Sequence, residues 1–286
     1  MLKVLVTGSN GQLGRSIQEI IGELKDKVEF HFTDSNTLDI SKELEVQDIF
    51  KKNHFNYCIN CAAYTAVDNA EDNKDLAFAI NAYGSKNLAE VCEEYNCIFI
   101  HVSTDFVFDG TKEEPYTTLD QPRPLNIYGA SKLEGERLIQ KVAKKYFIIR
   151  TSWVYSEFGN NFVKTMIKLS REKDKLDVVS DQIGSPTYAR DLARFLLKII
   201  IDKSDEYGIY HFSNDGVLSW YDFAKAIIKL KNSDTKVFPV TSSDYMTKAS
   251  RPKYSVMNKE ETIKTFGIKL EPWQTSLKTC VQNLNY

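Results

Sequence analysis

Three glycines, spaced three residues apart, stand directly after the first apolar run of the chain and before its first amphipathic stretch. Residues 3–6 are nearly continuous in apolar character, and Gly8, Gly11 and Gly14 follow them. Glycine permits a tight strand-to-helix turn and a close backbone approach to a ligand, and the N–H groups of the following helix favour a pyrophosphate. A purely structural turn is the alternative. In this context the spacing predicts the first βα unit of a dinucleotide-binding fold.

Short apolar runs alternate with helix-length amphipathic stretches over the first half of the chain, a pattern typical of parallel βαβ units. The predicted strands cover residues 2–7, 28–33, 56–61, 97–103 and 146–151. The predicted helices cover residues 12–23, 42–52, 75–95 and 128–144. We therefore expect an α/β fold with a doubly wound, Rossmann-like parallel sheet whose two faces are both covered by helices.

The pattern loosens after Arg150. Helices are predicted near residues 160–172, 187–202 and 219–231, and strands near 176–180 and 208–212. Segments 104–127 and 233–258 are polar, contain proline and are long for simple connections, so we expect them to form walls of a substrate cleft. We predict a dinucleotide-binding domain over residues 1–150. Residues 151–286 mainly form a smaller, partly discontinuous substrate-binding lobe, some of whose segments return to the first domain.

Charge and composition exclude several classes of protein. The 286 residues include 37 basic and 39 acidic side chains, a formal net charge of -2, without a long single-sign block. This argues against a nucleic-acid partner and against an electrostatic membrane anchor. No apolar stretch approaches the roughly 20 residues that span a bilayer, and no targeting segment is visible. We expect no membrane association.

The cysteines predict a reducing, cytoplasmic location, because an odd count of five in a chain of this size does not indicate disulfide staples. Cys58 and Cys61 form a C-x-x-C, which is a redox or metal element in some proteins. Here they lie on a predicted strand, where side chains three apart point to opposite faces. The four histidines have no ligand spacing, so we predict no metal site.

Tyr128 and Lys132 lie four residues apart at the start of a predicted helix, so both occupy one helix face. A lysine ammonium beside the phenol should lower the pKa of Tyr128 from about 10 toward neutral pH. Thr104 follows strand 97–103 at the carboxyl edge of the sheet, where open α/β folds bind ligands. Together they predict hydride-transfer chemistry. Thr104 would bind a substrate carbonyl, Tyr128 would protonate the forming alkoxide, and Lys132 would hold the nicotinamide ribose.

The other cofactor contacts are predicted from position along the chain. Asp34 ends the second strand, where an acidic residue would bind a ribose 2′-hydroxyl, whereas Arg15 could attract a 2′-phosphate. The cofactor is therefore NADPH or NADH. Asp39 is expected near the adenine or, equally well, at a helix N-cap. The predicted cofactor-binding residues are Gly8, Asn10, Gly11, Gln12, Leu13, Gly14, Asp34, Asp39, Ile40, Ala62, Ala63, Tyr64, Thr65, Tyr128 and Lys132.

Longer segments extend these motifs into a family resemblance. The chain resembles the extended short-chain dehydrogenase/reductase superfamily and, within it, the dTDP-4-dehydrorhamnose reductase family. The segments that carry the resemblance are 8–14, 60–68, 103–108, 128–132, 150–155, 159–166, 181–187, 219–223 and 250–252. They cover nearly the whole chain, and Asn160-Asn161 and segment 181–187 are much more selective than the glycine and Y-x-x-x-K motifs.

The resemblance implies reduction of the C4 keto group of dTDP-4-dehydro-L-rhamnose, a dTDP-sugar, with NADPH or NADH. It also implies that Thr104 and Asp105 face the sugar and that Trp153 packs against the nucleotide-sugar, although a tryptophan after a strand is more often a core residue. Some relatives dimerise through a divalent metal held by acidic side chains. The matching positions here are Arg15 and Arg190. We expect a monomer or a weak homodimer without a metal bridge.

Three other functions share the fold. Nucleotide-sugar dehydratases resemble this chain but place an Asp-Glu pair after the threonine, where this chain has Asp105 and Phe106. A sugar epimerase would use the same tyrosine with a bound NAD. A non-catalytic regulatory subunit, such as the β subunit of methionine adenosyltransferase, is also similar. The presence of Thr104, Tyr128 and Lys132 together argues against that last function.

Overall fold

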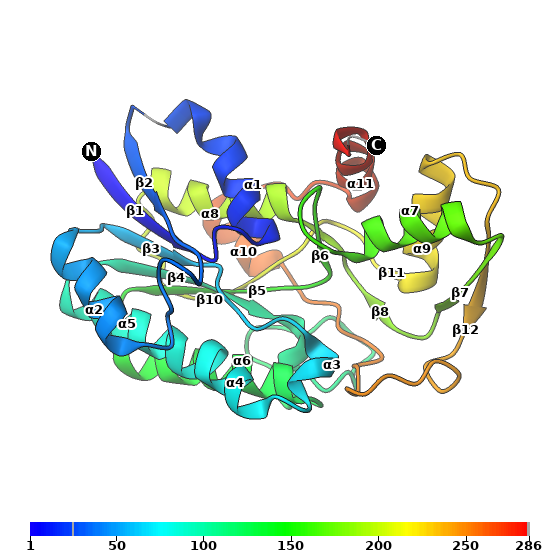
Figure 1. Cartoon of the computed structure of the whole chain (residues 1–286), viewed down its shortest axis with the longest axis horizontal. Helices are drawn as coiled ribbons and strands as arrows, with labels where there is room; N and C mark the ends of the chain where they lie inside the picture. The colour runs from blue at the N-terminus through cyan, green and yellow to red at the C-terminus, as the bar shows by residue number, and fades with distance from the viewer. Residues whose placement is uncertain (25, 285–286) are drawn as a thin grey trace.

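The computed structural model describes every residue of the chain except 25, 285 and 286. At its centre lies a six-stranded parallel sheet with the strand order β10-β5-β4-β3-β1-β2 (Figure 1). The strands are β1 (Leu2–Thr7), β2 (Val28–Phe32), β3 (Tyr57–Asn60), β4 (Ile98–Thr104), β5 (Tyr146–Thr151) and β10 (Gly208–Phe212). The predicted doubly wound α/β fold is confirmed, and the five strands expected in the first half of the chain are all present.

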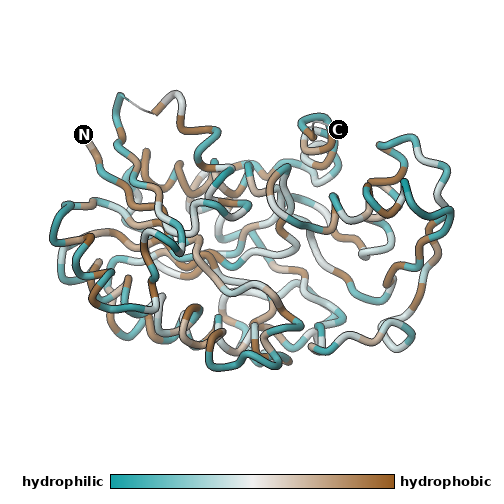
Figure 2. The backbone as a smooth tube through the Cα atoms, viewed as in Figure 1, coloured by the Kyte–Doolittle hydropathy of each residue, from teal (hydrophilic) through white to brown (hydrophobic). Residues whose placement is uncertain are grey.

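Helices cover both faces of this sheet. Successive strand residues point to opposite sides, and apolar side chains occur on both sides, so both faces must be buried. Val4 and Val6 pack in one core with α1 (Gln12–Ile20), α8 (Ala189–Ile201) and α10 (Glu260–Phe266). Leu5 points the other way, into a core with α2 (Glu43–Lys52), α5 (Ser85–Glu94) and α6 (Ile127–Val142). Figure 2 shows the central strands mainly in the hydrophobic colour, as expected for a sheet buried on both faces. The cysteines of the C-x-x-C also separate, with Cys58 in the second core and Cys61 against the first.

The second half of the chain contributes to this sheet as well as to a separate group of elements. Strand β10 pairs with β5, and α8 packs beside α1. The other group is built around a third core that contains Tyr155, Phe223 and Leu277. Its elements include α7 (Phe162–Glu172), α9 (Trp220–Leu230), α11 (Trp273–Asn283), β7 (Lys175–Val179) and β12 (Lys236–Val240). The division into a 1–150 domain and a 151–286 lobe stays a prediction.

Strand β12 and the helices α10 and α11 were not expected from the sequence. Strand β12 lies inside the segment 233–258 that we interpreted as a loop, and it pairs in parallel with β7, which lies about 60 residues earlier. Its partner is distant in sequence, so the local pattern carries little information about it. Two short pairs complete the lobe: β6 (Val154–Tyr155) with β9 (Thr187–Tyr188), and β8 (Ile183–Gly184) with β11 (Leu218–Ser219).

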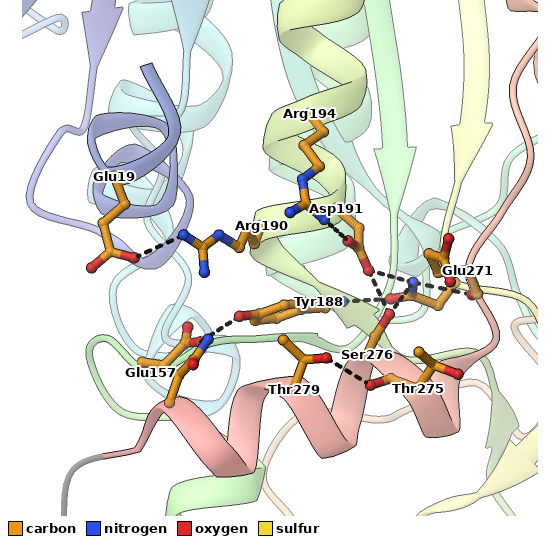
Figure 3. A network of polar contacts seen from close by, with 12 residues as sticks. Glu19, Glu157, Tyr188, Arg190, Asp191, Arg194, Glu271, Thr275, Ser276 and Thr279 are labelled. Carbon is orange, nitrogen blue, oxygen red and sulfur yellow. Dashed lines mark hydrogen bonds and ion pairs between the residues drawn. The ribbon is translucent and has the colours of Figure 1, made fainter. Parts of the chain in front are cut away.

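Buried polar contacts hold α11 against α8 and β9 (Figure 3). Ser276 donates a hydrogen bond to the Asp191 carboxylate at 2.5 Å, and Asn214 donates to the same carboxylate at 2.8 Å. Asn214 also accepts the backbone N–H of Tyr188 at 2.7 Å. The Tyr188 hydroxyl donates to Glu157. Satisfied groups of this kind fix one packing arrangement, because any other would leave buried polar atoms unpaired. No helix in the described part of the chain has the length and apolarity needed to cross a membrane.

Candidate active site

A cavity of about 550 Å³ opens at the carboxyl edge of the central sheet. Its walls come from the glycine turn, the ends of β4 and β5, the start of α6 and the segments around Trp153 and Asn161. The predicted site residues that line it are Gly8, Gly11, Gln12, Leu13, Gly14, Ala63, Thr65, Thr104, Asp105, Tyr128, Lys132 and Trp153. Residues from both halves of the chain therefore meet where ligands bind in open α/β folds.

The glycine turn has the form that a diphosphate group requires. Gly8 has φ +64°, and a Cβ at this position would lie 2.6 Å from the backbone nitrogen of Ala62, so only glycine lets the two loops approach. Helix α1 follows with no side-chain cap at its N-terminus. Its first N–H groups are thus available to an anion, and the helix dipole favours negative charge there. The residues present fit the phosphates of a dinucleotide.

Gln12 joins the glycine turn to the second half of the chain. Its side-chain oxygen accepts hydrogen bonds from Ser156 at 3.0 Å and from Asn161 at 2.9 Å. Asn161 also caps α7, because its side-chain oxygen accepts the backbone N–H of Lys164. The selective Asn160-Asn161 segment is therefore the link that places the start of α7 at the cavity.

Tyr128 is brought to the cavity by the close approach of α6 to the end of β4. Asn126 caps the helix by accepting the backbone N–H of Gly129 at 2.8 Å. A Cβ at Gly129 would lie only 2.1 Å from the carbonyl oxygen of Phe106, so the approach requires glycine. Thr104, on the facing strand, donates to Asp105 at 3.1 Å and accepts the backbone N–H of Phe106 at 3.2 Å. Tyr128 and Thr104 thus lie on opposed elements held together by backbone contact.

The pKa of Tyr128 differs from the expectation based on the sequence. Tyr128 as a whole is half-buried, but its hydroxyl is desolvated, and this burial raises the pKa of Tyr128 to about 12, while a hydrogen bond with Thr104 acts in the opposite direction. The predicted lowering by Lys132 is wrong for this structure. Lys132 directs its amine toward the backbone oxygen of Val102, at 2.7 Å, and toward His101, at 3.1 Å.

Two further ionisable groups in the cavity are shifted by burial. Lys132 is 1% exposed, and burial lowers its pKa to about 8, with Glu136 acting in the opposite direction. Burial raises the pKa of Asp105 to about 6, against hydrogen bonds from Ser255 and Thr104. One Asp105 oxygen accepts from Thr104, and the other is buried without a partner. Perturbed groups of this kind are typical of functional sites.

Trp153 separates this cavity from a neighbouring one of about 410 Å³. The two cavities share Phe106, Trp153 and Trp220 in their linings. Trp153 stacks on Trp220 at 3.6 Å between ring centroids and has φ +48°, an unusual backbone conformation for a bulky residue. The second cavity is also lined by Asp68 and Arg251, which form an ion pair at 2.6 Å. The site is therefore long enough to take an extended ligand on both sides of Trp153.

Comparison with known proteins gives matches over almost the whole length. The family model described as "RmlD substrate binding domain" matches residues 2–286. The chain belongs to the RmlD substrate binding domain family. A dTDP-4-dehydrorhamnose reductase from Aggregatibacter actinomycetemcomitans is 42% identical, with 97% of this chain and 98% of that protein covered.

Solved structures of RmlD-like proteins agree with this assignment. A dTDP-4-dehydrorhamnose reductase from Clostridium acetobutylicum is 45% identical with a TM-score of 0.95, and 99% of each chain is covered. A dTDP-4-dehydrorhamnose reductase from Bacillus anthracis, solved in complex with NADP, is 40% identical with a TM-score of 0.94 and the same coverage. The resemblance inferred from sequence segments is confirmed at the level of the family.

Several predicted cofactor-binding residues do not line the RmlD-family cavity. Asp34 accepts a hydrogen bond from Asn10 at 2.5 Å, and Asp39 accepts both the backbone N–H and the hydroxyl of Ser41. Ile40 is 4% exposed and packs in the core beneath α5. Ala62 and Tyr64 also fall outside the cavity lining, and Arg15 stacks its guanidinium on Phe158 at 4.2 Å. Asp39 does not cap α2, because the N-cap of that helix is Lys42 and no side chain caps it. The cofactor roles of these residues stay predictions.

Asn81 was not predicted as a site residue from the sequence, and it lies in a π-helical segment (Ala79–Gly84) between α4 (Lys74–Phe78) and α5. The Asn81 side chain accepts the N–H of Tyr64 at 2.8 Å and donates to the carbonyl oxygen of Tyr64 at 3.0 Å and to Ser131 at 3.0 Å. It therefore ties the loop after β3 to the residue that precedes Lys132. No periodicity in the sequence marks this side chain, because its partners are distant along the chain.

A buried ion pair beneath the cavity was also missed. Arg150 on β5 forms a two-pronged contact with Glu136 on α6, at 2.7 Å and 3.0 Å, and Ser103 donates to the same carboxylate at 2.5 Å. The side chains of Arg150 and Glu136 are 3% and 0% exposed. The pair holds α6 to the sheet one turn after Lys132. Among the described residues, no cluster of three or more His, Cys, Asp or Glu side chains could hold a metal ion.

Proposed function

We propose that the protein is an oxidoreductase that reduces the C4 keto group of dTDP-4-dehydro-L-rhamnose, with NADPH or NADH as the reductant. The observation that carries the proposal is that Thr104, Tyr128 and Lys132 line one cavity with the glycine turn. The similar proteins named above are dTDP-4-dehydrorhamnose reductases, and the match extends over nearly their whole length, which supports this substrate.

The cofactor would lie with its phosphates at Gly8 to Gly14 and its nicotinamide ribose at Lys132, and when bound it supplies the hydride. The available N-terminus of α1 supports the phosphate position. The Bacillus anthracis protein contains NADP, which supports NADPH as one of the two candidates. Asp34 would bind the 2′-hydroxyl of NADH if Asn10 gives up its hydrogen bond.

The chain's own residues would bind and protonate the carbonyl oxygen. Thr104 would donate a hydrogen bond to that oxygen, and Tyr128 would give its proton to the forming alkoxide. A pKa of about 12 keeps the phenol protonated at neutral pH, as a proton donor must be. Asp105 and Trp153 would contact the sugar and the nucleotide-sugar from the two cavities.

The test is to mix the purified protein with dTDP-4-dehydro-L-rhamnose and a reduced cofactor that carries deuterium at its transferable position. We expect nicotinamide absorbance to fall and deuterium to appear at C4 of the product. Tyr128→Phe should lower kcat by about 10²- to 10⁴-fold. Tyr83→Phe, at a tyrosine 55% exposed on the surface, should leave kcat unchanged.

The same experiment separates the alternatives. An epimerase would change the sugar without net consumption of the cofactor, and a dehydratase would release water. A regulatory subunit would bind the cofactor without turnover. Absence of absorbance loss with both NADPH and NADH would rule out the reductase proposal.

A further inference from the structure

Three segments that lie far apart in the sequence meet at the start of α6, and each of them contacts the other two. They are α3 (Val67–Ala70) with the residue that follows it, the N-cap region of α6, and segment 248–251. Helix α3 packs against α6 (Figure 1). It also lies at both cavities, because Val67 lines the first and Asp68 lines the second. The contacts among these segments therefore place the start of α6 relative to both cavities.

Two of the three contacts involve the segment at the second cavity. The Asp68 carboxylate accepts the backbone N–H of Ala249 at 3.0 Å and two nitrogens of Arg251 at 2.6 Å and 3.2 Å. Asn126, the N-cap of α6, donates to the carbonyl oxygen of Ser250 at 2.8 Å. This segment is thus attached both to α3 and to the cap of the helix that carries the predicted proton donor.

The third contact joins α3 directly to the first residue of α6. Glu71 follows α3, and its carboxylate accepts the backbone N–H of Ile127 at 2.9 Å. The first N–H groups of a helix have no acceptor within the helix, so they need acceptors from elsewhere. Asn126 supplies one to Gly129, the third residue of α6, whereas the first residue takes its acceptor from Glu71. The residues held in this way are the two sequence neighbours of Tyr128.

We propose that Glu71 is a positioning residue that fixes the first turn of α6 from α3 and thereby holds the Tyr128 hydroxyl at the cavity. A rigid peptide unit joins Ile127 to Tyr128, so a displacement of the first residue moves the second. A carboxylate suits this place, because negative charge is favoured at a helix N-terminus and a charged acceptor makes the stronger hydrogen bond. The role of Tyr128 as proton donor rests on the proposed function, whereas the contact with Glu71 does not.

The first test needs neither substrate nor cofactor. In Glu71→Ala, the amide of Ile127 should exchange with solvent about tenfold faster than in the wild type, as expected for the loss of one hydrogen bond to a charged acceptor. The ¹³Cζ resonance of Tyr128, assigned with Tyr128→Phe, should shift as well. Glu71→Gln keeps a carbonyl oxygen that accepts the same N–H, so both observables should return toward their wild-type values. An unchanged Tyr128 resonance in Glu71→Ala would overturn the proposal.

The second test asks whether Glu71 acts through Tyr128 during turnover. Glu71→Ala should lower kcat by about 10- to 10²-fold with KM unchanged, because a displacement of about 1 Å at a reacting group can cost about 10²-fold. In a Tyr128→Phe background the proton donor is already absent, so the same substitution should have little further effect on kcat. An equal loss in both backgrounds would contradict the proposal, because a general loss of folded protein lowers both activities equally.

Glu94→Ala is the matched control, because Glu94 is exposed at the end of α5, at the edge of the sheet opposite the cavity. It should leave kcat, KM and both NMR observables as in the wild type. If Glu71→Ala does not fold, Glu71→Asp takes its place, since it keeps the charge but withdraws the carboxylate by one methylene group. A wild-type kcat and Tyr128 resonance in that variant would equally refute the role of Glu71. If the wild-type protein does not reduce the substrate, the proposed function fails, and the amide exchange and the Tyr128 resonance still decide whether Glu71 positions the helix turn.

Discussion

The substitution Gly129→Ala tests whether backbone contact between α6 and the end of β4 sets the position of the proton donor. The added methyl group would lie 2.1 Å from the carbonyl oxygen of Phe106 and 3.0 Å from the side chain of Pro124. Restoring an ordinary contact of 3.4 Å requires the helix to move back by about 1.3 Å. Asn126 caps the same turn, so the displacement carries Tyr128 with it and away from Thr104.

We expect two measurable effects of Gly129→Ala. A displacement of about 1 Å at a reacting group can cost about 10²-fold in rate, so kcat should fall by about that factor. Overpacking should cost about 1 to 3 kcal/mol in the free energy of unfolding, partly offset by the higher helix propensity of alanine. The assays are cofactor consumption at saturating substrate and denaturant unfolding followed by circular dichroism.

Gly22→Ala is the control, because a Cβ at Gly22 meets nothing within 4 Å. It should leave kcat unchanged and leave the free energy of unfolding equal or slightly higher. If Gly129→Ala folds and keeps the wild-type kcat, or if the two variants lose activity equally, the close approach does not position Tyr128.

Three other substitutions test separate parts of the site. Glu136→Gln leaves the buried Arg150 charge without its carboxylate and should lower the free energy of unfolding by about 3 to 5 kcal/mol, whereas Glu134→Gln, on an exposed pair, should change it by less than about 0.5 kcal/mol. For Asp105, the folded pKa of about 6 lies above the usual aspartate value of 3.8, so the folded state binds the extra proton and loses stability as the pH rises between these values. Asp105→Asn should not show this loss. Between pH 4 and pH 7, the free energy of unfolding of the wild type, measured with urea, should fall relative to that of the variant by up to about 3 kcal/mol. If the two proteins show the same pH dependence, the Asp105 pKa is not raised by burial. Asp68→Asn weakens the ion pair that holds the segment around Arg251 at the second cavity. It should raise KM for the nucleotide-sugar by about fivefold with kcat unchanged. An unchanged KM would place that segment outside the substrate site.

The short-range features of the site were predictable from the sequence. The glycine turn, the position of Thr104 at the end of β4 and the common helix face of Tyr128 and Lys132 depend on residues close together in the chain. Turn chemistry and apolar periodicity act over a few residues, so local pattern is enough to place them. The odd cysteine count and balanced charge likewise needed no structure.

Other expectations depended on contacts that local pattern does not contain. Ile40 was predicted to bind the cofactor, a role that stays a prediction, and its side chain packs in the core with residues of α5 that lie far away in the sequence. Strand β12 was interpreted as loop because its partner β7 lies far away in sequence. The pKa of Tyr128 was expected to fall, yet burial by surrounding elements raises it. Each of these outcomes is set by neighbours that only folding brings together.

The sequence by itself determined which chemical groups are available: a glycine turn, a hydroxyl at a strand end, and a phenol and an amine one helical turn apart. The tertiary structure decided their burial, their hydrogen-bond partners and their pKa values. It buried Lys132 against His101, stacked Trp153 on Trp220 and set α6 in contact with Phe106. The physical reason is that residue type and spacing are local properties. Burial, hydrogen-bond direction and pKa are sums over atoms that come from distant parts of the chain.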